Sequence, residues 1–250
     1  MSSVAISLIA FACVFGGALL GIFLRGILPP HHLSAGSKDI VRMGMGLVGT
    51  MAALVLGLLV ASAKSSYDSQ SDEMTQLSTN VVFLDRLLAH YGPEAKGVRD
   101  QLREAVVRTV ARVWPKDRST PSGLEPVAAN EAVSETIQQL SPKDGMQREL
   151  QERALKVADR LLRTRWLMYE QGAGPVPLPM LVVLILWLTI IFVSFGLFAP
   201  RNGTVIASLC VAALSVSCAI LLILEMYQPF EGIIQISSAP LYTALAHLGR

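Results

Sequence analysis

Charged residues are scarce in this chain, and four long runs contain none. Asp, Glu, Lys and Arg make up 16% of the 250 residues, against the roughly 25% that soluble domains carry. The uncharged runs are Val4–Leu24, Met43–Ala63, Gly172–Pro200 and Gly203–Leu224. With a rise of about 1.5 Å per residue, each run can cross the roughly 30 Å hydrocarbon layer as a helix. Because lipid leaves a non-helical backbone without hydrogen-bond partners, the runs predict four transmembrane helices in an all-α fold.

Cysteine is also scarce. The three cysteines, Cys13, Cys210 and Cys218, all lie in the apolar runs. The polar middle of the chain has none, which excludes disulfides and thiolate metal sites there.

The charge of the polar middle is balanced, and its sequence lacks the motifs of catalysis. Residues 64–175 hold 16 basic and 16 acidic side chains, so no concentrated positive field is available for nucleic acid. The chain has no phosphate-binding glycine loop and no nucleophile elbow, and the adjacent His31 and His32 point apart in regular structure. We therefore expect no enzymatic activity, no metal and no cofactor.

The order of polar and apolar segments predicts four regions. Residues 1–63 form transmembrane helices 1 and 2, and residues 64–175 form an inserted, polar helical bundle. Residues 176–225 form transmembrane helices 3 and 4. Residues 226–250 are too short and too broken by Pro and Gly for a fifth span, which leaves an interfacial segment or a tail packed on the bundle.

The second span is predicted to continue into the polar bundle. From Leu58 to Tyr91 there is neither Gly nor Pro, the residues that usually interrupt a helix. Between Tyr67 and Tyr91 the apolar positions follow a heptad-type helical spacing. One helix from Met43 to about His90 accounts for both observations.

Three further helices are predicted in the polar middle, and each has one apolar stripe that needs a bundle to cover it. They are Glu94–Trp114, Asn130–Leu140 and a last helix that ends at Gly172, with Pro115–Ala128 as a loop. Ser141-Pro142-Lys143-Asp144 is a typical helix start, with a hydroxyl cap, a proline at the first position and an acid in the first turn.

Arginines recur along the first of these predicted helices. They are Arg99, Arg103, Arg108 and Arg112. Their spacing fits a solvated face that pairs with nearby acids or, alternatively, a strip that binds an anion or lipid.

Small residues recur every three or four positions along the second span. They are Gly46, Thr50, Ala53, Gly57 and Ala61. Such a stripe can let the first span, which has Gly17 and Gly21, pack closely against the second. It can also line an axial pore in an oligomer, where Thr50 supplies a hydroxyl. By contrast, the aromatic residues of the third span predict that it faces lipid.

Several local strings resemble a known family. They are Leu56-Gly57-Leu58-Leu59 through Tyr67-Asp68, Leu84-Asp85-Arg86-Leu87-Leu88, Tyr91-Gly92-Pro93-Glu94, Arg99 with Leu102-Arg103, and Gln228-Pro229-Phe230-Glu231-Gly232 with Ile236-Ser237. Together they are similar to the bacterial bestrophin-like domain family. A more remote similarity to bestrophins implies a ring of subunits that conducts anions, with the second span on the pore and the polar middle in the cytoplasm.

Two functions remain open from the sequence. The first is an oligomeric, passive, bestrophin-like anion channel, since the spans lack the internal charges that mark pumps and voltage sensors. The second is a membrane-anchored interaction or sensing protein, with a protein partner at residues 64–175 and no transport.

Both functions imply a multi-pass protein of the bacterial plasma (inner) membrane, and the side of the polar bundle depends on which signal is used. The short loops carry Arg25, Lys38, Arg42 and Arg201, which favours cytoplasmic loops and an extracytoplasmic bundle. The similarity to bestrophins implies the opposite side.

Overall fold

The structure, a computed structural model, describes residues 2–29, 35–115, 128–172, 178–230 and 232–249. These residues form eight α-helices and one 3-10 turn, with no strand among them, so the all-α prediction is confirmed. The chain divides into two compact units. We call Met1–Ser65 with Pro175–Tyr227 the membrane unit, and Ser66–Gly174 with Gln228–Arg250 the polar unit.

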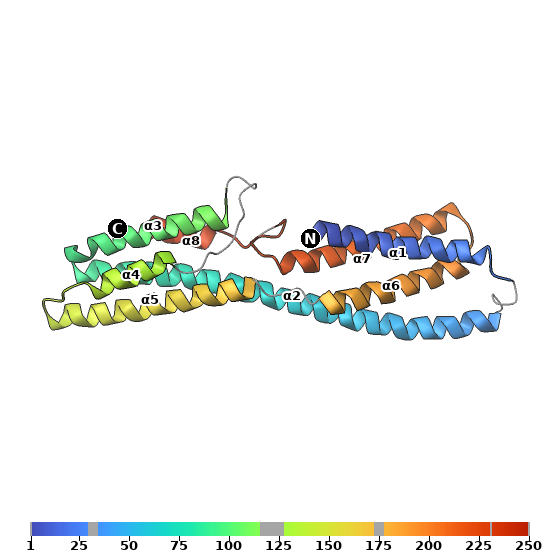
Figure 1. The fold of residues 1–250 in the computed structure, drawn as a ribbon, viewed down its shortest axis with the longest axis horizontal. Helices are drawn as coiled ribbons and strands as arrows, with labels where there is room; N and C mark the ends of the chain where they lie inside the picture. Colours follow the sequence, from blue (N-terminus) through green and yellow to red (C-terminus); the bar gives the residue numbers. More distant parts are fainter. Residues whose placement is uncertain (1, 30–34, 116–127, 173–177, 231, 250) are drawn as a thin grey trace. The chain divides into compact units, whose positions relative to one another are not determined.

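The membrane unit contains α1 (Ser3–Arg25), α6 (Leu178–Phe198), α7 (Gly203–Met226) and the first part of α2 (Ala35–Tyr91). These four helices, which lie side by side in Figure 1, are long and apolar enough to cross a membrane. The four predicted spans are therefore confirmed.

The closest helix contact of the membrane unit joins α1 to α6. A methyl group added at Gly21 would lie 2.1 Å from the carbonyl oxygen of Val193, and one added at Gly196 would lie 2.0 Å from the carbonyl oxygen of Ala18. Gly17 also contacts α6, at Thr189. The sequence suggested that the small residues of the first span pack on the second span. In the structure they pack on the third span instead. Spacing reveals a face that permits close approach but cannot name the partner helix.

The prediction that the third span faces lipid is wrong in part. Leu184 and Phe192 of α6 are buried against neighbouring helices, whereas Phe195 is about half exposed. A helix that is apolar on every side can meet lipid or protein with any face, so its aromatic residues do not reveal its surroundings.

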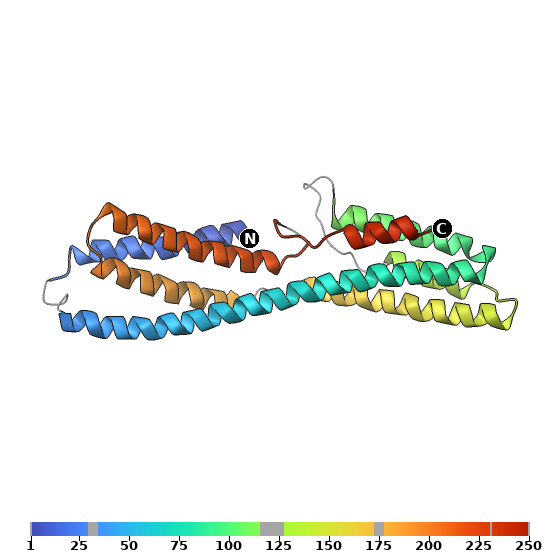
Figure 2. The same ribbon diagram turned by 180° about the vertical axis from the view of Figure 1, so that it is seen from behind.

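The second span continues as predicted: α2 is one helix of 57 residues, drawn in cyan in Figure 2. It begins at Ala35, eight residues before the predicted Met43. The segment 35–42, which precedes the apolar run, is therefore also helical. Its last part, from Ser66 to Tyr91, belongs to the polar unit.

The polar unit packs the end of α2 with four other helices and a 3-10 turn. They are η2 (Pro93–Ala95), α3 (Lys96–Val113), α4 (Ala128–Gln138), α5 (Gly145–Gly172) and α8 (Ala239–His247). Their apolar stripes meet in one continuous core. Its fully enclosed members include Met74, Leu84, Ile137, Met168 and Leu241. The predicted loop Pro115–Ala128 lies almost entirely outside the described residues.

The start of α5 differs from the prediction by three residues. The helix begins at Gly145, and Asp144 Oδ1 accepts a hydrogen bond from the Gln147 backbone N–H at 2.7 Å. The Gln147 side chain accepts one from the Lys143 N–H, one residue before the cap, in an arrangement similar to a capping box. The Asp144 and Gln147 side chains satisfy two otherwise unpaired N–H groups, and Asp144 therefore serves as the cap in place of Ser141.

The C-terminal segment packs into the polar unit. Phe230, Ile236 and Leu241 are buried in the core of that unit, and α8 lies beside α3 (Figure 2). The Trp114 indole N–H donates to the carbonyl of Ile236 at 3.0 Å, and the Ser78 hydroxyl donates to the carbonyl of Pro240 at 2.7 Å. Of the two alternatives for the tail, the structure shows the one packed on the bundle.

Candidate functional site

The stripe of small residues on α2 is exposed in the single chain. Gly46, Thr50, Ala53, Gly57 and Ala61 all lie on the surface. A methyl group added at Gly46 or at Gly57 would meet no atom within 4 Å. The chain's own helices therefore leave this face of α2 uncovered.

A different face of α2 contacts the rest of the membrane unit. Ala52, Leu59 and Ala63 are buried, next to Leu184 of α6 and Ile223 of α7. With 3.6 residues per turn, these positions centre about 140° around the helix from the stripe. The stripe and the packing face are therefore nearly opposite.

Large apolar side chains flank the stripe on one side. They are Leu47, Met51, Leu54 and Leu58, and each is at least 43% exposed. In the most apolar window of α2 only 11% of the residues are buried, against 33% in α1. Of the four spans, α2 thus presents the most uncovered apolar surface.

A groove of about 610 Å³ lies beside the start of the stripe. Gly46 and Gly49 of α2 line one wall, and α6 and α7 supply Phe195, Ser194 and Ser208 among others. Arg42 is the charged residue among the lining positions. The Thr50 hydroxyl donates to the carbonyl of Leu47 at 2.7 Å, so its proton is held by its own helix.

The sequence strings that carry the family resemblance include residues that join helices of the polar unit. Arg99 Nε donates to Asp85 Oδ1 at 2.7 Å and Arg99 Nη2 donates to Oδ2 at 3.0 Å, which joins α3 to α2. The Gly249 N–H reaches the same carboxylate at 3.4 Å. The Asp85 side chain is 2% exposed and Arg99 is 20% exposed, and this bidentate bond raises the pKa of the Arg99 guanidinium.

The string that begins at Tyr91 makes the turn from α2 into η2. Gly92 has a φ of 126°, a value that L side chains rarely adopt, and Pro93 follows at the first position of η2. Glu94 is held by Lys143, which lowers the pKa of its carboxyl. The Tyr91 carbonyl accepts a hydrogen bond from the Gln147 side chain at 2.9 Å. These residues position helices, and we assign them no chemistry.

Sequence reasoning overlooked one polar site, at Arg165 in α5. It lies outside the predicted arginine row of α3, yet it lines a cavity in the core of the polar unit. A basic residue four positions from the apolar Leu161, on the buried side of α5, is the signal that could have revealed it. Across the described parts of the chain, no three His, Cys, Asp or Glu side chains gather as a metal site would require.

Comparison with known proteins agrees with this architecture. A family model, the bestrophin-like domain, matches residues 12–241. The chain belongs to the bestrophin-like domain family. No curated protein sequence matches it.

Two solved structures have the same fold. Both are crystal structures of a bacterial bestrophin homologue from Klebsiella pneumoniae, and each carries a different point mutation. The first has a TM-score of 0.69 at 14% identity and covers 99% of this chain and 97% of the other. The second has a TM-score of 0.64 at 15% identity and covers 94% and 97%. This bestrophin-like chain is therefore a membrane protein with a bestrophin fold over nearly its whole length.

Proposed function

We propose that this protein forms a ring of identical subunits in the bacterial plasma membrane and conducts small anions passively, with the α2 stripe on the axis. The observation that carries the proposal is the uncovered stripe of Gly46, Thr50, Ala53, Gly57 and Ala61. A face of small residues leaves space along an axis between subunits. A helix face that contacts only lipid does not require small side chains.

The flanking apolar side chains support the ring. Leu47, Met51, Leu54 and Leu58 lie about 90° around α2 from the stripe. A helix that turns one face to an axis turns a neighbouring face to the next subunit. Large side chains on that face give the dispersion contact that holds helices together in lipid.

The charge distribution supports a passive path for anions. The uncharged run of α2 offers no titratable side chain that could couple transport to protons. Lys38 and Arg42 outnumber Asp39 at the start of the helix, which gives the mouth a positive potential.

Chloride flux into proteoliposomes tests the pore. The Gly57→Trp variant fills the stripe and is expected to abolish flux. Gly16→Trp is the matched control, because Gly16 is an exposed glycine of α1 with no atom within 4 Å of an added methyl group. Normal chloride flux through Gly57→Trp, or an equal loss of flux in both variants, would contradict the proposal that the stripe lines the pore.

A second candidate is a membrane-anchored interaction or sensing protein. It is favoured by large apolar side chains on the surface of the polar unit, which a protein partner at residues 64–175 could cover. They are Phe83, Val107, Met146, Trp166 and Leu167. A single-subunit mass in native lipid together with electrically silent bilayers would favour this candidate over the channel.

The orientation of the polar unit has a direct test. We propose the extracytoplasmic side, from the positive short loops. A reporter fused at Ser122 that is active only outside the cytoplasm is expected to be active. An inactive fusion, with a cytoplasmic reporter active at the same position, would place the polar unit inside.

A further inference from the structure

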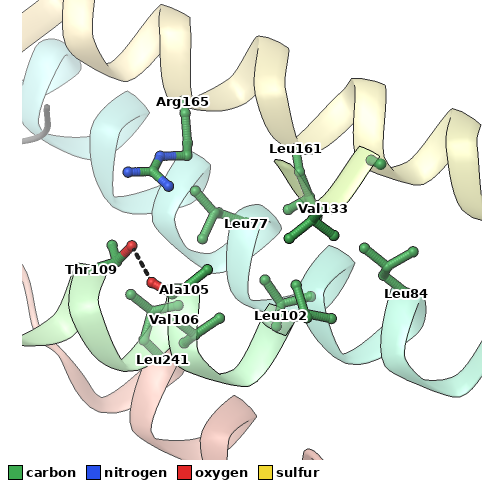
Figure 3. A pocket seen from close by; sticks show the side chains of 12 residues that line it. Leu77, Leu84, Leu102, Ala105, Val106, Thr109, Val133, Leu161, Arg165 and Leu241 are labelled. Carbon is green, nitrogen blue, oxygen red and sulfur yellow. Dashed lines mark hydrogen bonds between the residues drawn. The ribbon is translucent and has the colours of Figure 1, made fainter. Parts of the chain in front are cut away.

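A small cavity of about 30 Å³ lies in the core of the polar unit. Its walls come from α2, α3, α4, α5 and α8 and are almost wholly apolar. Figure 3 shows Leu77 and Leu84 of α2, Leu102 and Val106 of α3, and Leu161 of α5 around it. The polar residues of the lining are Thr109 and Arg165, on the left of this view.

Arg165 lines one end of this cavity and carries a buried donor. Its Nε is inaccessible to solvent and has no hydrogen-bond partner within the described chain. An unsatisfied buried donor is costly, more so on a charged group, and in native proteins it calls for an unseen partner. Burial lowers the pKa of Arg165, and the positive charge of Arg112 lowers it further. Two arginine side chains are therefore close enough at this site to affect each other's charge.

Water alone satisfies this site poorly. A buried water molecule ordinarily has two to four polar partners, and a cavity above about 10–15 Å³ can hold one. Here the Thr109 hydroxyl already donates its proton to the carbonyl of Ala105 at 2.8 Å. Arg165 and Thr109 are the lining side chains with a polar group to offer, and a neutral guest brings no opposite charge to the guanidinium. An anion accepts a charge-assisted hydrogen bond from Nε and balances that charge.

We infer that this cavity binds a small monovalent inorganic anion, held by Arg165. The cavity admits a species of about one water or halide ion in size, which excludes lipid headgroups and carboxylates with a tail. The site belongs to the polar unit alone, so the inference does not rest on the proposed channel. Bound there, the anion ties α5 to the packing of α2 and α3.

Bromide is a direct probe. Crystals of the full chain in detergent, grown or soaked in bromide, are expected to show an anomalous peak within hydrogen-bonding distance of Arg165 Nε. A water at that position with no anomalous signal, while bromide is seen elsewhere in the crystal, would overturn the inference.

Thermal unfolding gives the test in solution. When bromide replaces gluconate at constant ionic strength, the wild-type Tm is expected to rise by a few degrees and to saturate, as binding to the folded state requires. Arg165→Met should abolish the rise. Arg163→Met is the matched control, because Arg163 lies on the same helix, is 76% exposed and pairs with Asp159 at 2.9 Å.

The variants separate a specific site from a general salt effect. An equal rise in all three proteins would mean that bromide acts elsewhere and would overturn the inference. If Arg165→Met does not fold, the position of bromide in wild-type crystals decides the question.

Discussion

The two units of this chain are packed by different means. In the membrane unit the buried residues fall into separate small clusters, and backbones approach closely at Gly21 and Gly196. In the polar unit one continuous core collects apolar side chains from six elements. Lipid is as apolar as leucine, so helices within it associate through close backbone contact, whereas water drives large side chains into a single core.

Hydrogen exchange read by mass spectrometry can measure this difference, because it reports on the peptides of each unit separately. A substitution in one unit is expected to raise exchange there and to leave the other unchanged. Exchange that rises equally in both would contradict the division into two cooperative units.

The largest effect is expected from Asp85→Asn in the polar unit. The change leaves Arg99, only 20% exposed, without its ionised partner, and breaking a buried pair in this way costs about 3–5 kcal/mol. Peptides of α3 should exchange faster. Asp159→Asn is the control with the same change of charge, because its pair with Arg163 is on the surface, and a surface pair is worth only about 0–1 kcal/mol.

Leu84→Ala follows, with a loss of about 3 kcal/mol in the polar unit. Leu84 has no exposed surface, and removing its side chain loses apolar burial and opens a cavity. Phe83→Ala is the neighbouring control, since Phe83 is 52% exposed and should change stability little. If Phe83→Ala proves as costly as Leu84→Ala, another chain covers that surface in the assembled protein.

Gly21→Ala is expected to cost about 1–3 kcal/mol in the membrane unit, as overpacking does. The added methyl group meets the Val193 carbonyl oxygen at 2.1 Å, so α1 and α6 must separate. The Tm in detergent should fall, and α1 and α6 should exchange faster. Gly16→Ala is the control, because the same methyl group at that position meets no atom within 4 Å. An unchanged Tm for Gly21→Ala would mean that close glycine contact does not hold this unit together.

The smallest effect is expected at Glu94, and it depends on pH. Its pKa is below the ordinary value of 4.5 because of the hydrogen bond from Lys143. The carboxylate therefore stabilises the folded state above the unfolded-state pKa, and this contribution is lost as pH falls through the lower folded-state pKa. Glu94→Gln should lower the Tm slightly at neutral pH and leave it unchanged in strong acid. A difference that persists below the folded-state pKa would assign the effect to packing.

Local features of the fold could be predicted from the sequence, and partners could not. The absence of Gly and Pro between Leu58 and Tyr91 was enough to predict that α2 is continuous. The contact of Gly21 with α6 could not be predicted. The spacing of small residues defines one face of α1, but it does not identify which helix packs on that face. The position of Arg165 on the buried side of α5 could have been read from its spacing to Leu161, but the cavity could not, since its walls come from five helices. The small-residue stripe was visible from spacing, and its place on an axis remains a prediction.

The C-terminal segment fixes an order of assembly during translation. The residues of the membrane unit are all synthesised by Tyr227, whereas the core of the polar unit still lacks Phe230, Ile236 and Leu241. The polar unit therefore cannot complete its core until after the last span has been made. Until the ribosome delivers those last residues, α2 and α3 expose the apolar surface that the segment later covers, which is the interval in which a chaperone would be most needed.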